Sequence, residues 1–97
     1  MVERDELVLG IDSSTTATKA VLVRGDGAVA GVGVGEYEFD TPRPGWSEQS
    51  PHLWWTATRH AIAAALADAG EDGSAVQAVG LTGQMHGSVL LDSAGEV

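Results

Sequence analysis

Apolar runs and short polar breaks alternate along the first quarter of the chain, a pattern that predicts strands joined by tight turns. Residues 7–11 (Leu-Val-Leu-Gly-Ile) are almost continuously apolar, which favours a strand covered on both faces over one lying on a surface. A hydroxyl-rich break follows at residues 12–16, and the apolar, partly β-branched residues 20–23 predict the returning strand. We therefore expect a β-hairpin over residues 7–24.

A Gly-Asp-Gly turn signal separates this hairpin from a third predicted strand, residues 28–39. Its apolar side chains lie at even positions in the first half and then at odd positions, Tyr37 and Phe39, after Gly35. A one-residue slip in phase beside a glycine predicts a β-bulge. The other face of the first half carries glycines at positions 31, 33 and 35, so either another element packs closely there or the strand is a thin edge.

Between the third strand and the next apolar pattern, residues 41–50 are polar and contain two prolines and a glycine, which predicts a loop. Trp46 is the exception in this segment. A large aromatic side chain in a polar loop either anchors the loop or lines a pocket, and we favour anchoring.

A helix is predicted between Ser50 and Gly70, because Ser50 can act as its N-cap, Pro51 as its first residue and Gly70 as its C-cap. His52 and His60 lie on or near this helix without a metal-ligand partner at useful spacing, so we interpret both as surface or packing side chains. One apolar stripe recurs at three- and four-residue spacing: Trp54, Thr58, Ala61, Ile62, Ala65, Leu66 and Ala69.

Two more strands are predicted after the helix. Residues 76–82 form a near-continuous apolar run and residues 88–91 a shorter one, and a loop bounded by two glycines, residues 83–87, lies between them. A turn is predicted at residues 92–95, after which residues 96–97 open a further strand.

The order of these elements predicts how they meet in space. A helix between two buried strands favours a right-handed parallel crossover, so strand 76–82 should lie beside strand 7–11 and parallel to it. The loops 12–16 and 83–87 then follow the carboxyl ends of two adjacent strands at a topological switch point, where open α/β sheets bind ligands. We expect both loops to face one cleft.

Composition and charge limit the classes of protein to which this chain can belong. The chain of 97 residues makes one small domain or part of a larger one, and its apolar fraction of 43% is enough for a core. It has no run long enough to span a bilayer, no signal-peptide core in its charged start and no cysteine. The formal net charge of −9 opposes binding to nucleic acid or to an anionic membrane. We therefore expect a cytoplasmic protein that binds neither nucleic acid nor an anionic membrane.

The hydroxyl-rich turn can bind phosphate. Small residues let a ligand approach the backbone, and successive N–H groups with hydroxyls can hold phosphate oxygens without much positive charge. Asp12, at the end of the buried strand, can hold a water on Mg²⁺ or face a transferring phosphoryl group. The alternative is a polar hairpin whose Asp and Ser side chains bond their own backbone.

The second loop can bind a polyol. Met85 offers a pliable apolar contact, and Gln84 and His86 offer donors and acceptors for hydroxyl groups. The alternative is a turn bounded by glycines, with His86 pointing to water.

The segment from Gly10 to Lys19 resembles the first phosphate-binding hairpin of the sugar-kinase, Hsp70 and actin superfamily, whose pattern is Asp-x-Gly-Thr-x-x-x-Lys. Ser14 stands where that pattern has glycine, which changes the turn but removes no necessary side chain. The resemblance implies an α/β fold of the ribonuclease H-like type: a mixed sheet with three antiparallel strands, a crossover helix and a further parallel strand.

Two further motifs resemble the FGGY carbohydrate kinases: Trp46-Ser-Glu-Gln-Ser-Pro51-x-x-Trp54-Trp55, and the loop from Gly83 to Gly87. The Gln-Met-His-Gly version of that loop is typical of the family members that phosphorylate xylulose. The similarity runs from about residue 7 to residue 97, with the three motifs in the family's order.

This resemblance implies MgATP-dependent phosphorylation of D-xylulose at its 5-hydroxyl. Asp12 would act near Mg²⁺, through water, and near the phosphoryl group. The sugar would contact Gln84, Met85 and His86. The nucleotide phosphates would be addressed by Ser14, Thr15, Thr16 and Lys19.

The same resemblance implies that the chain is incomplete. FGGY kinases are two-domain clamps of several hundred residues, and their general base, an aspartate, would lie beyond residue 97, as would the adenine-binding segments and the second domain. We therefore expect residues 1–97 to be a partial N-terminal domain, a truncated or excised piece that is inactive alone and self-associates through apolar surface. The alternatives are an FGGY kinase for another ketose or polyol, and a non-catalytic nucleotide-binding or interaction module of actin-like fold.

Overall fold

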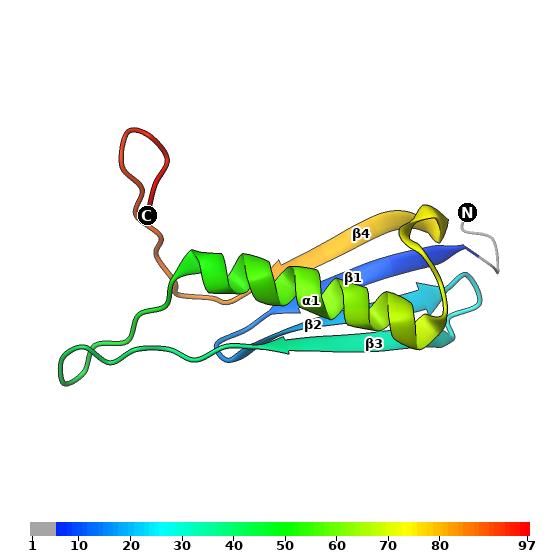
Figure 1. Ribbon diagram of the computed structural model, residues 1–97, viewed down its shortest axis with the longest axis horizontal. Helices are drawn as coiled ribbons and strands as arrows, with labels where there is room; N and C mark the ends of the chain where they lie inside the picture. Colours follow the sequence, from blue (N-terminus) through cyan, green and yellow to red (C-terminus); the bar gives the residue numbers. More distant parts are fainter. Residues whose placement is uncertain (1–5) are drawn as a thin grey trace.

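A computed structural model describes residues 6–97; the start of the charged N-terminal segment, residues 1–5, lies outside the described part. Four strands, one long helix and one short 3₁₀ helix follow one another along the chain (Figure 1). Their bounds are β1 Leu7–Ser13, β2 Ala17–Arg24, β3 Val29–Glu36, α1 Pro51–Ala69, η1 Gly73–Ala75 and β4 Val76–Gly83.

The four strands form one mixed sheet in the order β3-β2-β1-β4. Neighbours β3 and β2, and β2 and β1, are antiparallel, whereas β4 lies parallel to β1. The predicted crossover is therefore confirmed: the chain leaves β1 on one side through β2 and β3 and returns through α1 to its other side.

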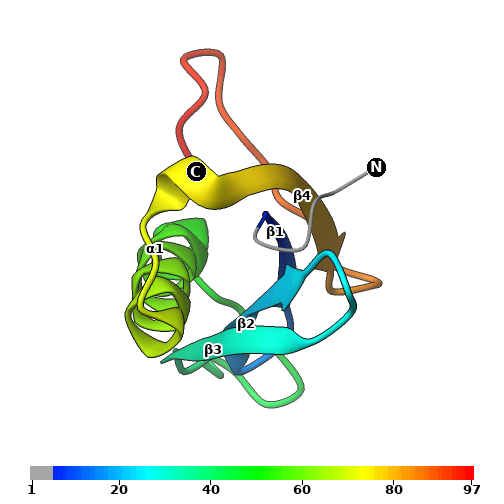
Figure 2. The same cartoon turned by 90° about the vertical axis from the view of Figure 1, so that its right-hand side faces the viewer.

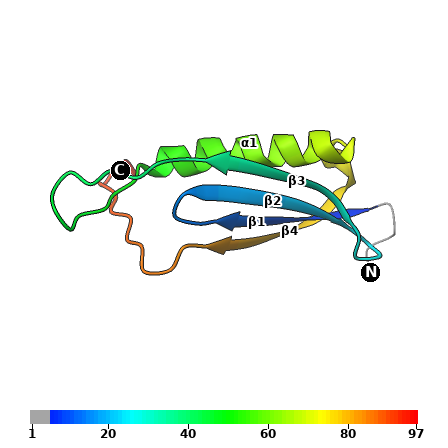
Figure 3. The ribbon, with the colours of Figure 1, turned by 90° about the horizontal axis from the view of Figure 1, so that it is seen from below.

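Helix α1 covers one face of the sheet, as the view along the strands and the view from below both show (Figures 2 and 3). It begins and ends as predicted: the Ser50 side chain accepts from the His52 N–H, and Gly70 adopts the left-handed conformation with φ 68°. Alternate residues of β1 and β2 turn their side chains toward the helix. The core comprises Leu7, Leu9, Ile11, Ala20, Leu22, Ala61 and Ala65.

The glycines of β3 lie directly under α1, so both interpretations of that strand are correct: it is the sheet edge, and the helix packs closely on it. β-carbons built on these glycines would lie only 2.0–2.4 Å from helix carbonyl oxygens, closer than real contacts allow. The pairs are Gly31 with Ala65, Gly33 with Ala61, and Gly35 with Ala57.

The predicted bulge beside Gly35 is wrong. Positions 31, 33, 35 and 37 are buried in unbroken alternation, and the register with β2 shifts instead between Leu22 and Val23. The apolar residues changed phase because glycines replace side chains on the helix-facing side, not because the backbone slips. The strand also ends at Glu36, earlier than residue 39.

The region after α1 is less covered than the pattern of apolar residues predicted. Strand β4 forms, but Val79 is 60% and Leu81 77% exposed, because α1 packs against β1, β2 and β3. Residues 88–91 form no strand, since no free neighbour within residues 6–97 pairs with them. The turn after them does form, with the Gly95 N–H donating to the Asp92 carbonyl at 3.0 Å.

Polar contacts hold together the end of the sheet that lies opposite the loops 12–16 and 83–87. The Arg24 guanidinium lies 3.4 Å from the Glu71 carboxylate and ties the end of β2 to the segment after α1. Hydrogen bonds from the Ser74 hydroxyl and N–H lower the pKa of Asp72, which caps η1. No helix within residues 6–97 is long and apolar enough to cross a membrane.

Candidate functional site

The two loops singled out in the sequence leave the same edge of the sheet. Strands β1 and β4 run side by side in the same direction, with Asp12 opposite Thr82 and Ser13 opposite Gly83 in their register. The β1–β2 turn and the chain after β4 accordingly emerge at the same end of the sheet (Figure 3). This adjacency is the geometry that the order of elements predicted, and it creates the topological switch point.

Asp12 and Lys19 share the face of the sheet that α1 does not cover. They are paired across β1 and β2, and Thr82 is the partner of Asp12 on the other side, so all three side chains project to one face. Asp12 and Lys19 are both exposed. Within residues 6–97 no hydrogen bond or ion pair engages either charged group, so both are open to a ligand.

The turn between β1 and β2 is closed by one of its own serines. The Ser14 N–H and hydroxyl both donate to the Ala17 carbonyl oxygen, each at 2.9 Å. That contact matches the alternative in which the turn bonds its own backbone. Thr15 and Thr16 remain exposed at the tip, and in the described part of the chain neither their N–H groups nor their hydroxyls have an acceptor.

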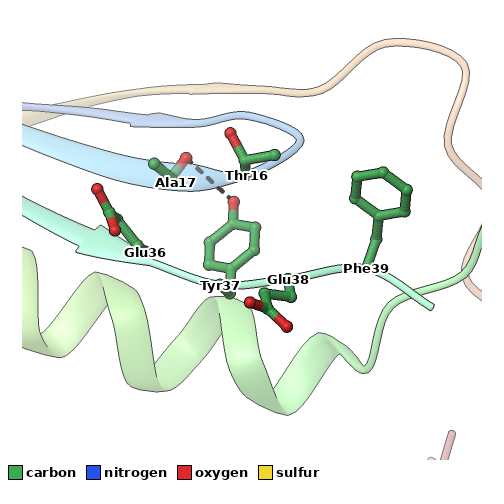
Figure 4. A pocket seen from close by; sticks show the side chains of 6 residues that line it. All are labelled: Thr16, Ala17, Glu36, Tyr37, Glu38 and Phe39. Carbon is green, nitrogen blue, oxygen red and sulfur yellow. Dashed lines mark hydrogen bonds between the residues drawn. The ribbon is translucent and has the colours of Figure 1, made fainter.

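Tyr37 supports the turn from below. Its hydroxyl lies 3.1 Å from the Ala17 carbonyl oxygen (Figure 4). The same hydroxyl hydrogen-bonds the Ser14 carbonyl and lies 3.3 Å from the Ser13 hydroxyl. The ring is buried on the same side as the β3 glycines. The sequence pattern placed Tyr37 in a strand but missed this role; the signal available was a lone tyrosine continuing the glycine alternation.

Gln49 supports the turn from the side. Its amide N–H₂ donates to the Thr15 carbonyl, and its amide oxygen accepts from the Trp54 indole N–H at 3.0 Å. The Trp-Ser-Glu-Gln-Ser-Pro segment is therefore tied to the hairpin through one side chain, a link that the sequence motif did not reveal. Trp46 has a local role instead: it is 53% exposed, and the Arg43 guanidinium lies 5.0 Å from its ring centroid.

The second loop presents its side chains to solvent. Gln84, Met85 and His86 are all exposed, Met85 by 77%. His86 adopts φ 64°, a left-handed conformation that a residue with a β-carbon rarely takes. Such conformations cluster at functional sites, so His86 is a candidate binding residue.

Two shallow hollows lie around the end of β3, one toward the hairpin and one toward α1, and neither lies between the two loops. One, of about 700 Å³, lies where Tyr37 rises from the chain after β3 toward the hairpin (Figure 4). The carboxylates of Glu36 and Glu38 line both hollows, which disfavours phosphate there, and neither hollow includes Asp12, Lys19 or the loop 84–86. His60 lines the second hollow, and residues 6–97 contain no cluster of three metal-ligating side chains.

The described residues form an α/β domain with one candidate site at the switch point of its mixed sheet. That site combines a hydroxyl-rich hairpin with free N–H groups, an unpaired carboxylate and a second polar loop, which are features of phosphate-binding domains. The sequence profile of the FGGY family of carbohydrate kinases, N-terminal domain, matches residues 7–97. The chain therefore belongs to the FGGY family of carbohydrate kinases, which are phosphotransferases.

Individual relatives agree with the family. The chain is 38% identical to the xylulose kinase of Escherichia coli over 90% of its length, and 38% identical to a glycerol kinase of Rhizobium rhizogenes over 88%. A crystal structure of a xyloylose kinase from Brucella ovis superposes with a TM-score of 0.87 at 41% identity over 94% of the chain. The fold is thus that of sugar kinases, as predicted. The chain spans only 17–19% of the length of these three proteins.

Proposed function

We propose that the full-length protein carrying this chain transfers the γ-phosphate of ATP to D-xylulose, giving D-xylulose 5-phosphate, in the cytoplasm. The observation that carries this proposal is the parallel pairing of β1 with β4, which brings the hydroxyl-rich hairpin and the Gln-Met-His loop to one edge of the sheet. The similarity to xylulose kinases supports the choice of sugar.

The hairpin residues fit a nucleotide bound with magnesium. Sugar kinases of this family use ATP, generally with Mg²⁺, and Mg²⁺ in such sites takes one or two carboxylates together with substrate phosphates. Asp12 is one exposed, unpaired carboxylate and would hold the ion through water. The ion would neutralise phosphate charge; Thr15, Thr16 and Lys19 would bind phosphate oxygens, while the Ser14 hydroxyl, bonded to Ala17, would help only after turning away.

The loop after β4 would hold the sugar. Gln84 and His86 would exchange hydrogen bonds with its hydroxyl groups, and Met85 would pack against its carbon chain. The positive φ of His86 sets the direction of that side chain at the loop tip.

The base that accepts the proton of the attacking hydroxyl would come from beyond residue 97. Asp92 is unsuited to that role, because its carboxylate accepts from the Ala94 and Glu96 N–H groups at 2.9 Å in a turn. Residues 1–97 alone should therefore be a partial domain without measurable kinase activity. Turnover of ATP and D-xylulose by the purified 97-residue chain would contradict this.

A substrate panel tests the choice of sugar. The full-length enzyme is offered D-xylulose, D-ribulose, glycerol and gluconate with MgATP, and kcat/KM is compared. D-Xylulose should exceed the others by at least about tenfold, the discrimination that one well-formed hydrogen-bonding subsite supplies. A preference for glycerol is the second candidate, favoured by the equal identity to a glycerol kinase. Binding of ATP with no response to any sugar would instead indicate a nucleotide-binding module.

A further inference from the structure

Two consecutive carbonyl groups of the hairpin turn are held by side chains from elsewhere in the fold. The Ser14 carbonyl accepts from Tyr37, which follows β3, and the Thr15 carbonyl accepts from Gln49, which precedes α1. Neither contact is required to close the hairpin, because Ser14 and Ala17 already do so. The contacts fix the orientation of two successive peptide groups.

Fixing a carbonyl also fixes the following N–H. In a trans peptide the C=O and N–H bonds point in opposite directions, and no cis peptide bond occurs in the described residues. Holding the Ser14 carbonyl therefore turns the Thr15 N–H away from Tyr37, and holding the Thr15 carbonyl turns the Thr16 N–H away from Gln49. Neither N–H group has an acceptor within residues 6–97, so both are available to donate hydrogen bonds to a bound anion.

Gln49 suits this task because it is both a donor and an acceptor. The Thr15 carbonyl needs a donor and the Trp54 indole N–H needs an acceptor, so only one orientation of the Gln49 amide satisfies both. Trp54, in the first turn of α1, thereby holds the Gln49 side chain, which in turn holds the Thr15 carbonyl of the hairpin.

We propose that Tyr37 and Gln49 are positioning residues: they orient the Thr15 and Thr16 N–H groups so that these can donate to the phosphate oxygens of the nucleotide. Neither side chain touches the phosphates. This inference rests on the proposed function. In a chain with net charge −9 and one lysine in the hairpin, oriented N–H groups supply donors that cationic side chains do not.

The test measures nucleotide binding directly in the full-length protein. Gln49→Met and Tyr37→Phe remove the two donors without adding charge or much changing volume, and MgATP and D-xylulose affinities are measured separately by calorimetry. Both variants should bind MgATP about five- to tenfold more weakly, as expected for misdirected hydrogen bonds, with the D-xylulose Kd unchanged. Gln77→Met is the matched control: its amide also donates to a carbonyl, that of Ala75, but at the other end of the sheet, and MgATP should bind normally.

The outcomes separate this inference from the proposed function. Unchanged MgATP affinity in both variants, or equal weakening of MgATP and D-xylulose, overturns the positioning role. If Gln49→Met does not fold, Tyr37→Phe and Trp54→Phe carry the test, with normal thermal unfolding required of each. A wild-type protein that binds MgATP but phosphorylates no sugar defeats the proposed function alone, because the positioning role is judged on MgATP binding without sugar.

Discussion

His86 combines an unusual backbone conformation with a side chain that is exposed at a loop tip. Its φ of 64° places a β-carbon in the left-handed region, a strain of about 1 kcal/mol that glycine would not have. No hydrogen bond within residues 6–97 holds the side chain in place. The strain is understandable if the imidazole is needed where a sugar binds.

Replacing His86 should therefore separate the two ligands. In the full-length enzyme His86→Ala should weaken D-xylulose binding by roughly tenfold through loss of one hydrogen-bonding side chain, while MgATP affinity stays the same. Isothermal titration with each ligand measures both values. His60→Ala, on the exposed side of α1, is the control and should change neither; equal loss of both ligands in His86→Ala would count against the assignment.

Asp12 should matter for phosphoryl transfer rather than for the sugar. Asp12→Asn removes the only unpaired carboxylate on β1 at the switch point, so kcat should fall by about a hundredfold or more with the D-xylulose Kd retained. Asp40→Asn, in the exposed loop before α1, is the matched control. Steady-state kinetics with a coupled ADP assay gives kcat; an unchanged kcat in Asp12→Asn would refute the role.

The hydroxyl, carboxylate and amide residues of the site could be named from the sequence because turn chemistry is local. Asp12, the threonines of the turn and the Gln-Met-His loop lie where strands end, and strand ends are visible in the apolar pattern. Tyr37 and Gln49 could not be assigned in the same way. Their contacts with Ser14 and Thr15 span 23 and 34 residues, so they exist only after β3 and α1 have docked.

At the scale of the elements, α1 packs very closely on β3, because the row of glycines at positions 31, 33 and 35 lets the helix backbone approach the strand. The apolar pattern is read from side chains, and glycines have none, so the pattern cannot show that a row of glycines faces the helix. For this reason the change from even to odd apolar positions in residues 28–39 suggests a bulge that the strand does not have. The helix caps were predictable because Ser50, Pro51 and Gly70 act locally, and the crossover was predictable because the helix lies between two buried strands. Residues 88–91 were misassigned because a strand needs a partner, which apolarity alone does not provide.

A methyl group added to that glycine row should be poorly tolerated. The β-carbon of Gly33→Ala would lie 2.0 Å from the Ala61 carbonyl oxygen, so α1 must shift, at a cost of about 2–3 kcal/mol in unfolding free energy. Urea denaturation of the 97-residue chain followed by circular dichroism measures the loss. Gly80→Ala in β4, where nothing lies within 4 Å, should change stability by well under 1 kcal/mol; equal effects would disprove the packing argument.

At the scale of the whole molecule, the sheet is covered on one face only. Apolar side chains remain exposed on both sides of it: Val32, at 48%, lies on the open face of β3, whereas Val79 at 60% and Leu81 at 77% lie on the α1 side of β4, beyond the reach of the helix. Exposed apolar strand surface of this kind favours association between molecules. The 97-residue chain by itself should therefore form dimers or larger assemblies.

Sedimentation velocity over a range of concentrations tests this expectation. Leu81→Lys places a charge on the exposed β4 and should shift the chain toward monomer, because burying that charge in an interface is unfavourable. Leu53→Lys, on the exposed side of α1 at 44%, adds the same charge elsewhere and should not. A single monomeric species at all concentrations for the unmodified chain would contradict the prediction.

The position of β4 also bears on how a family of this kind can diversify. The strand is joined to the rest of the sheet through β1 alone. The loop proposed to select the sugar follows β4, whereas the hairpin proposed to bind phosphate connects β1 and β2. Substitutions in the loop after β4 can therefore change its side chains while the β1–β2 hairpin keeps its conformation. Descendants of a single ancestral sheet could inherit the same nucleotide chemistry and acquire new acceptors a few residues at a time.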